Sequence, residues 1–170
     1  MKGRLIGAEM NKRKKIEMIE MYKKQGVEHI GSITKRDLFV IGVSLYWAEG
    51  SKKDGKLAFV NSDPLMILLM YRWFQEVQKV PKEDFMPRIF INEMHRSRAD
   101  VVLSFWSGLL KLPAEQFGNI TFLKMKQKKV YSNYDQYYGI LSLRIRRSSK
   151  LKYQILGLIN GVIENSKLSG

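Results

Sequence analysis

The sequence contains no cysteine and only two histidines, His29 and His95, among its 170 residues. Zinc-finger sites and thiol nucleophiles are therefore excluded, because both need side chains that the chain lacks or has too few of. A metal ion would have to be bound by carboxylates and water, and this chemistry favours Mg²⁺. We interpret the two histidines as surface or half-buried residues.

Long apolar segments are also missing. No run of eighteen apolar residues occurs, so we expect no segment to span a bilayer and no membrane partner. The first fifteen residues lack the apolar core of a signal peptide, and we therefore expect a cytoplasmic protein.

Acidic residues are scarce relative to basic ones. The chain has 30 Lys and Arg against 16 Asp and Glu, which gives a net charge of +14. Such a charge attracts polyanions, of which nucleic acid is the commonest and an acidic membrane surface the other candidate. The length and the hydrophobic fraction of 45% are those of one globular domain with a buried core.

The hydrophobic pattern predicts an α+β domain at 34–165, with one mostly antiparallel sheet and helices packed on one face. A basic helical extension precedes it at 1–33, and a short tail follows at 166–170. Within the domain we expect a capped helix ending near 51, strands within 56–61, 86–93, 119–127 and 137–146, and helices at 64–77, 99–112 and 149–164.

The extension is rich in Lys and Arg, with ten of them against four Glu in residues 1–36. Met10, Ile16, Ile19 and Tyr22 recur at roughly helical spacing, which predicts a helix over 9–25. Two interpretations are open. The helix packs on the domain with its basic face in water, or it is an arm that lies along nucleic-acid phosphates.

The stretch from Leu38 to Ser51 is an apolar helix pattern with a cap at each end. Thr34 and Asp37 have the spacing of a capping box, and Gly50 suits a left-handed closing residue. Glu49 is unfavourable there, because its carboxylate meets the negative end of the helix dipole. A bound cation would explain it; the alternative is a surface carboxylate that tolerates a poor position.

One face of the same helix carries Ile41, Ser44 and Ala48. Two small residues four apart let a second helix approach closely. We therefore expect a helix–helix interface on this face.

The nonamer VSLYWAEGS at 43–51 resembles the signature helix of the LAGLIDADG homing endonucleases. Ala48, Glu49 and Gly50 take the place of the closing Ala-Asp-Gly. Ser44 stands where the signature usually has its first Gly, and Trp47 where many members carry an additional acid. The following SKKDGKLAFVNSDP is similar to a bacterial branch of the same family, and the likeness covers roughly 37–162.

The resemblance implies a saddle-shaped sheet over DNA and Mg²⁺-dependent phosphodiester hydrolysis, with Glu49 and Gly50 at the metal. A chain with a single signature helix would act as a homodimer through Ile41, Ser44 and Ala48, on a near-palindromic duplex target. Two alternatives remain open: a DNA-binding regulator without nuclease activity, and an RNA-binding maturase.

The last two predicted strands and their flanks are strongly basic, with nine Lys or Arg against one Asp in 123–152. Strand alternation points Leu141, Leu143 and Ile145 to the core and the polar residues to the other face. Leu123 is predicted on the core side and Phe122 and Lys124 on the open side. The predicted DNA contacts are Arg88, Asn92, Lys124, Lys126, Lys128, Lys129, Ser142, Arg144 and Arg146, and Lys126 is also the predicted catalytic lysine. A solvated sheet face is the alternative.

Overall fold

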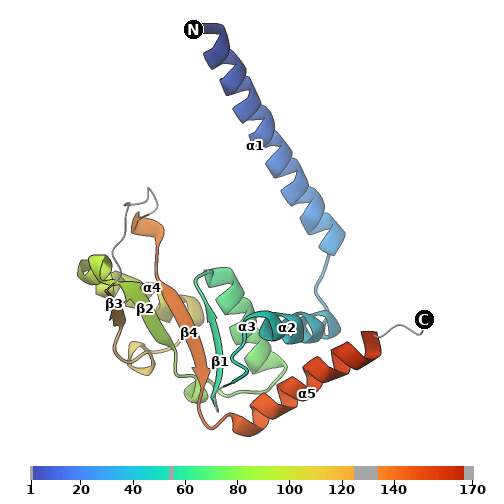
Figure 1. Cartoon of the computed structure of the whole chain (residues 1–170), viewed down its shortest axis with the longest axis vertical. Coiled ribbons are helices and arrows are strands. Elements are labelled where there is room, and N and C mark those ends of the chain that lie inside the picture. Colours follow the sequence, from blue (N-terminus) through green and yellow to red (C-terminus); the bar gives the residue numbers. More distant parts are fainter. Residues whose placement is uncertain (1, 54–55, 125–133, 167–170) are drawn as a thin grey trace. The chain divides into compact units, whose positions relative to one another are not determined.

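The computed structural model describes residues 2–53, 56–124 and 134–166, with side chains from Gly7 onward. The chain divides into two compact units, Met1–Thr34 and Lys35–Gly170 (Figure 1). No helix in the described part of the chain is both long and apolar enough to cross a membrane.

The first unit contains one helix, α1 (Lys2–Ile30), which is longer than the predicted 9–25. It ends at Gly31, whose φ of 63° is the left-handed conformation that glycine adopts at low cost. Met10, Ile16, Ile19 and Tyr22 are all exposed, between 41% and 60%. Both interpretations of this helix stay predictions.

The second unit contains every helix and strand predicted for 34–165, and the α+β prediction is confirmed. The long helices and strands are α2 (Lys35–Glu49), β1 (Leu57–Asn61), α3 (Pro64–Glu76), β2 (Arg88–Asn92), α4 (Ala99–Leu110), β3 (Thr121–Leu123), β4 (Ile140–Ile145) and α5 (Ser149–Ser166). Short 3₁₀ turns are η1 (Lys82–Asp84), η2 (Glu93–Arg98), η3 (Ala114–Gln116) and η4 (Tyr134–Gln136).

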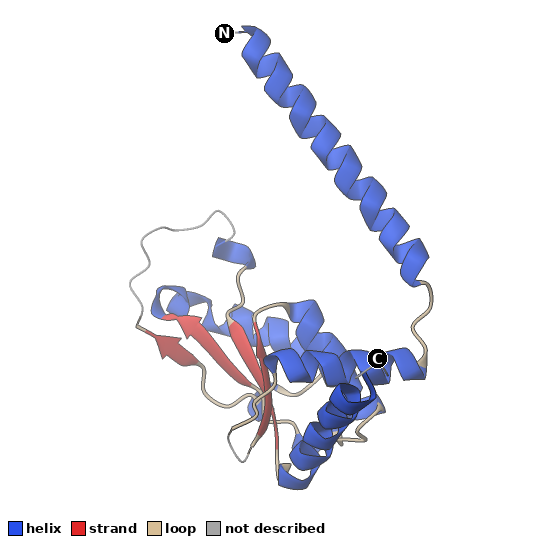
Figure 2. Ribbon diagram, turned by 45° about the vertical axis from the view of Figure 1, so that its right-hand side comes forward, coloured by secondary structure: helices blue, strands red, loops and turns tan. Residues whose placement is uncertain are grey.

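In the described residues the strands form a four-stranded sheet in the order β1-β4-β2-β3 (Figure 2). β4 pairs antiparallel with both β1 and β2, whereas β3 pairs parallel with β2. The last two strands are therefore not neighbours, and β2 lies between them. The predicted orientation of β3 is wrong, because Phe122 pairs with the buried Ile91 and Leu123 with Asn92.

The inner face of the sheet is apolar, as the alternation in β4 predicted. Leu141, Leu143 and Ile145 are all buried, next to Phe59 of β1. α3 packs on β1 and β4 and α4 packs beside α3, and both helices lie on this one face in Figures 1 and 2. α2 and α5 pack together against β1.

The helix starts differ in how they are capped. Asp63 caps α3, and its side chain accepts hydrogen bonds from the N–H groups of Leu65 and Met66. Ser97 and Asp100 have the spacing of a capping box, but they do not cap α4, because this helix follows directly on η2. The residue before α4 is Arg98, which makes no side-chain cap, and the N–H of Ala99 donates to a carbonyl of the preceding turn.

α2 and α3 come into close contact at Gly42. A Cβ atom built there would lie 2.1 Å from Cδ1 of Trp73, so only glycine fits. The indole of Trp73 is fully buried, and its N–H donates to the carbonyl of Phe39 at 3.2 Å. This contact fixes which side of α2 faces the core.

Gly42→Ala is expected to lower the free energy of unfolding by about 1–3 kcal/mol, because the added methyl overpacks the Trp73 contact. The matched control is Gly157→Ala in α5, where nothing lies within 4 Å of the added Cβ. That change should raise the free energy by about 0.5–1 kcal/mol through helix propensity alone. Urea titrations followed by tryptophan fluorescence report on the second unit, since Trp47, Trp73 and Trp106 all lie in it. Equal effects of the two substitutions would contradict the close approach.

Candidate carboxylate site and nucleic-acid interface

The end of α2 is held by hydrogen bonds on three sides. The N–H of Gly50 donates to the carbonyl of Tyr46 at 2.8 Å, and the N–H of Ser51 donates to Ala58 of β1 at 2.8 Å. The Tyr46 hydroxyl donates to the carbonyl of Ser51 at 2.6 Å, and burial raises the pKa of Tyr46 to about 12. The backbone around Glu49 is therefore tied to the edge of the sheet.

The prediction that Gly50 is left-handed is wrong, because its φ does not lie in the positive range. Glycine is required for a different reason. A Cβ at this position would lie 2.5 Å from the carbonyl oxygen of Tyr46 and 2.6 Å from its ring. The helix ends in a tight contact with the Tyr46 side chain and a bridge to Phe59.

Glu49 is exposed, and its carboxylate has no hydrogen bond or ion pair with any described residue. A cation that the sequence pattern did not predict lies beside it. Lys52 places its ammonium 3.5 Å from the carbonyl of Ala48, where a positive charge offsets the negative end of the helix dipole. A lysine three residues after the last carboxylate of a helix was the available signal.

The face of α2 predicted to form an interface is open in the single chain. Ser44 and Ala48 are exposed, and Ile41 is half-buried. Two larger residues extend the same face, Val40 at 38% and Trp47 at 43% exposure. The opposite side of the helix, with Leu38, Gly42, Val43 and Tyr46, is buried.

Two of the predicted DNA contacts are engaged within the domain. Nη1 of Arg88 donates to the carbonyls of Pro87, Gln116 and Phe117, at 2.8–3.3 Å. The side chain of Asn92 accepts from the N–H of Met94 and caps η2. Arg88 thus holds the loop at 116–117, and the Oδ1 atom of Asn92 fixes the start of the turn that follows β2.

The outer face of the sheet is less cationic than predicted. Ser142 is only 2% exposed, and its hydroxyl accepts from Nε of the half-buried Arg144 at 3.2 Å. Its neighbours across the sheet on this face are Val60 and Arg88. The predicted rows of cations are thus reduced, on the described strands, to Arg88 and Arg144.

The remaining predicted contacts lie beyond the strands. Lys124 is exposed just after β3, and Arg146 is exposed just after β4. Lys126, Lys128 and Lys129 lie outside the described residues, so the roles predicted for them stay predictions.

α5 also contains a buried lysine that the sequence pattern did not predict. Lys152 is 4% exposed and shares the inner face of α5 with Ile155 and Ile159, the face that packs on α2 and β1. Its ammonium forms no ion pair with any residue that the structure describes. A lysine within the apolar repeat of a helix was the signal, because burial of an ammonium is costly.

Residues that could hold Mg²⁺ are few in one chain. The described residues contain no group of three or more His, Asp or Glu side chains placed to bind a metal. Glu49 offers an accessible carboxylate, and Gly50 could add only its main-chain carbonyl. This donor set fits the one or two carboxylates that Mg²⁺ takes from a protein, with water completing the shell.

A separate network holds the segment that leads into β4. The buried His95 stacks on Tyr134 with ring centroids 4.2 Å apart, and its Nδ1 lies 3.1 Å from Nη1 of Arg98. Arg98 also donates to the carbonyls of Tyr134 and Tyr137, at 2.7 and 3.0 Å, and to that of Asp135. Because arginine can only donate, Nδ1 of His95 is the acceptor and is unprotonated. The prediction of a surface or half-buried His95 is wrong.

Comparisons of the chain with models of protein families, with curated proteins and with solved structures find no match.

Stability is expected to depend on pH through His95. Burial, reinforced by the positive charge of Arg98 and opposed by Asp135, lowers the pKa of His95 below 6.5. A lowered folded-state pKa means that the unfolded chain binds the proton more readily. The contribution of His95 to the free energy of unfolding should therefore be fully present above about pH 7. It should decrease as the pH falls through 6.5 toward the pKa of His95 in the folded protein.

Urea midpoints measured from pH 8 to 5 test this expectation, with His95→Gln as the control. Gln keeps an acceptor for Arg98 and cannot take up the proton in this range, so its curve should be flatter. Carboxylates titrate mostly below this window. Parallel curves for the two proteins would refute the role of His95.

Proposed function

We propose that this chain is a duplex-DNA-binding endonuclease that works as a homodimer through α2, with two Glu49 carboxylates brought together for Mg²⁺-dependent cleavage. The observation that supports it is the arrangement of α2. Its exposed face carries apolar and small side chains, and it ends at an exposed carboxylate without a partner among the described residues.

The dimer follows from the surface that one chain leaves open. Val40, Ile41, Ser44, Trp47 and Ala48 form a continuous stripe at helical spacing, partly or fully exposed to water. An apolar stripe of this kind is stabilised by a partner, and its small residues permit close packing of two helices. A two-fold axis running roughly along the two helices would bring both α2 C-termini to the same end of the contact.

The chemistry follows from what each Glu49 can do. When bound, Mg²⁺ lowers the pKa of a coordinated water and offsets charge on the phosphate. Glu49 would hold the ion, while the turn fixed by Tyr46 and Ser51 keeps the carboxylate in place. Lys52 adds a positive charge at the same helix end, where it can attract the scissile phosphate.

Binding would be supplied by the net charge of +14 and by the exposed cations near the strand ends. Lys124 and Arg146 are the accessible members of the predicted set within the described residues, and Arg144 is half-buried. A two-fold dimer would read a near-palindromic target.

A DNA-binding regulator without cleavage is the second candidate. The observation that favours it is that the described residues contain no cluster of metal-binding side chains around Glu49, so that hydrolysis depends on the two Glu49 side chains meeting.

Ala48→Arg is expected to convert a dimer into a monomer, because two like charges would face each other across the two-fold axis. Light scattering at micromolar concentration should give about twice the chain mass of 19.9 kDa for the wild type, and the chain mass for the variant. Val101→Arg places the same charge on another exposed apolar residue, in α4, and should leave the dimer intact. A monomeric wild type, or equal loss in both variants, would rule out α2 as the interface.

Glu49→Gln should abolish cleavage and leave DNA binding intact, because a neutral amide oxygen holds Mg²⁺ poorly. Thermal stability should not fall, since the carboxylate is exposed and meets the negative end of the helix dipole. Duplexes selected from a random library by the wild type would serve as substrates. Glu115→Gln, an exposed carboxylate in η3, is the matched control and should cleave like the wild type.

The outcomes separate the two candidates. Loss of nicking in Glu49→Gln alone supports the endonuclease. Retained binding without nicking by any of the three proteins supports the regulator, and equal nicking by all three removes Glu49 from the mechanism.

A further inference from the structure

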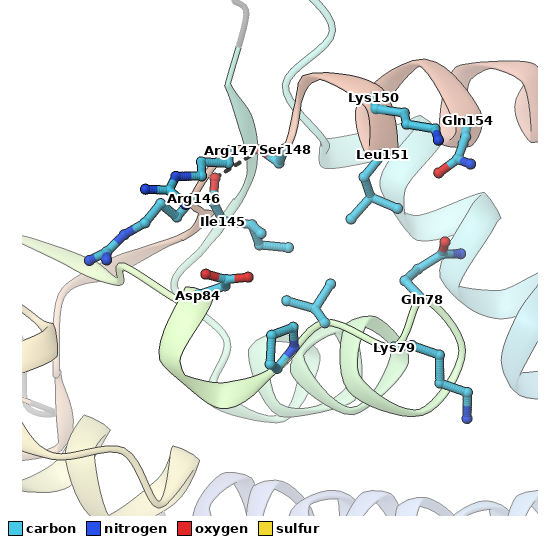
Figure 3. Close-up of a pocket in the computed structure, with 12 residues that line it drawn as sticks. Gln78, Lys79, Asp84, Ile145, Arg146, Arg147, Ser148, Lys150, Leu151 and Gln154 are labelled. Carbon is cyan, nitrogen blue, oxygen red and sulfur yellow. Dashed lines mark hydrogen bonds between the residues drawn. The ribbon is translucent and has the colours of Figure 1, made fainter.

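A second basic feature lies where β4 leads into α5. The residues between 78 and 84 and between 145 and 154 enclose an open pocket of about 330 Å³ (Figure 3). Its charged lining consists of Lys79, Arg146, Arg147 and Lys150, against the single carboxylate of Asp84. Only Arg146 belongs to the set of DNA contacts predicted from the sequence.

The backbone of this pocket is held firmly from both sides. Phe85 forms a bridge to Ile145, and the N–H of Arg146 donates to the carbonyl of Asp84 at 2.8 Å. The hydroxyl of Ser148 donates to Ile145 and accepts from the N–H of Leu57. The lining side chains therefore project from a rigid frame.

The charges around the pocket are not neutralised by the protein. None of the four cations forms an ion pair or a side-chain hydrogen bond with a described residue, and Asp84 has none either. All four cationic side chains are exposed. The four positive charges repel one another, and the single negative charge of Asp84 is too little to offset this repulsion. A bound anion would offset it.

Two of the cations occupy unusual backbone positions. Lys79 and Arg147 have φ values of 58° and 49°, where glycine or asparagine costs least. They are two of the three described non-glycine residues with positive φ, the third being Lys111 at the end of α4. The turns at this pocket thus carry cations where the backbone favours a smaller residue.

Figure 3 shows how these side chains lie. Arg146 and Arg147 leave the end of β4 on the side of Asp84, while Lys150 and Gln154 project from α5 on the other side. Lys79 lies at the far rim with its ammonium turned outward. Exposed arginine and lysine side chains change rotamer readily, so their ends can close on a ligand in the opening.

We propose that this pocket binds a phosphate group, with Arg147 and Lys150 as the main contacts and Arg146 beside them. Arginine binds phosphate through paired N–H donors, and lysine adds a mobile positive charge. The phosphate comes from one of two sources, a free phosphate or pyrophosphate ion or the backbone of a nucleic acid. Only the second source rests on the proposed function.

The test uses Arg147→Gln/Lys150→Gln in the full-length chain. Lys35→Gln/Lys111→Gln is the control, because it removes the same charge from exposed cations that do not line the pocket. Neither pair includes a residue of the proposed cleavage or DNA-contact set. Circular dichroism melting of all proteins shows that the fold is retained.

In the first arm, ¹⁵N-labelled protein is titrated with inorganic phosphate and then pyrophosphate, at constant ionic strength balanced with chloride. Saturable amide shifts confined to the pocket residues are expected for the wild type and for the control. The pocket variant should bind about tenfold or more weakly, since two charged hydrogen-bonding groups are lost.

In the second arm, the salt dependence of duplex binding is measured by fluorescence anisotropy. A backbone phosphate in the pocket would make the log–log slope of the pocket variant shallower than that of the control, by about 0.9 for each lost phosphate contact. Pyrophosphate would then compete with DNA for the wild type.

Localised phosphate binding with an unchanged DNA slope identifies a free-phosphate site, and a reduced slope with competition identifies a backbone contact. Absence of saturable phosphate binding together with equal slopes for the two variants overturns the proposal. If the protein does not bind DNA, the proposed function fails while the first arm still decides the phosphate site.

Discussion

The close approach of α2 and α3 at Gly42 is the contact on which the arrangement of the domain depends. Because Gly42 has no side chain, the indole of Trp73 packs directly on the α2 backbone. Its N–H donates a hydrogen bond to the carbonyl of Phe39. This rotates α2 so that Leu38, Val43 and Tyr46 are buried. The face with Ser44 and Ala48 is left in water for the same reason, and the Tyr46 ring is brought under the turn that carries Glu49. One steric requirement therefore decides both the buried face of the helix and what it presents outside.

Local patterns in the sequence predicted most of the fold. The helical pattern of α2 and the alternation of Leu141, Leu143 and Ile145 are encoded within a few residues each, and the structure agrees with them. The predictions that were wrong concern contacts between residues that are far apart in the sequence. β3 spans three residues, too few for alternation to fix its orientation, and its pairing with β2 set Phe122 toward the helices instead.

The candidate site was predictable in its residue types and less so in its geometry. Glu49 was found because a carboxylate at a helix C-terminus conflicts with a local rule. The role of Gly50 was misjudged, because its constraint is the Tyr46 ring and not a left-handed backbone. Arg88 and Ser142 were assigned to an open face by alternation alone. Arg88 hydrogen-bonds to the loop at 116–117, and Ser142 accepts a hydrogen bond from Arg144. No local sequence pattern predicts these contacts.

The central position of β4 has a consequence for how the domain is made. This strand is the last of the four along the chain, yet it pairs with both β1 and β2, which do not touch each other. Leu57 of β1 pairs with Ile145 of β4, so β1 cannot form its ladder before β4 has been synthesised. During synthesis β1 therefore has no strand partner until β4 has been made, whereas β2 and β3 can already pair with each other. Long-range pairing of this kind slows folding and leaves strand edges exposed to other chains. The four-stranded sheet is consequently indivisible: a fragment that stops before β4 leaves β1 without a strand partner and separate from the β2–β3 pair.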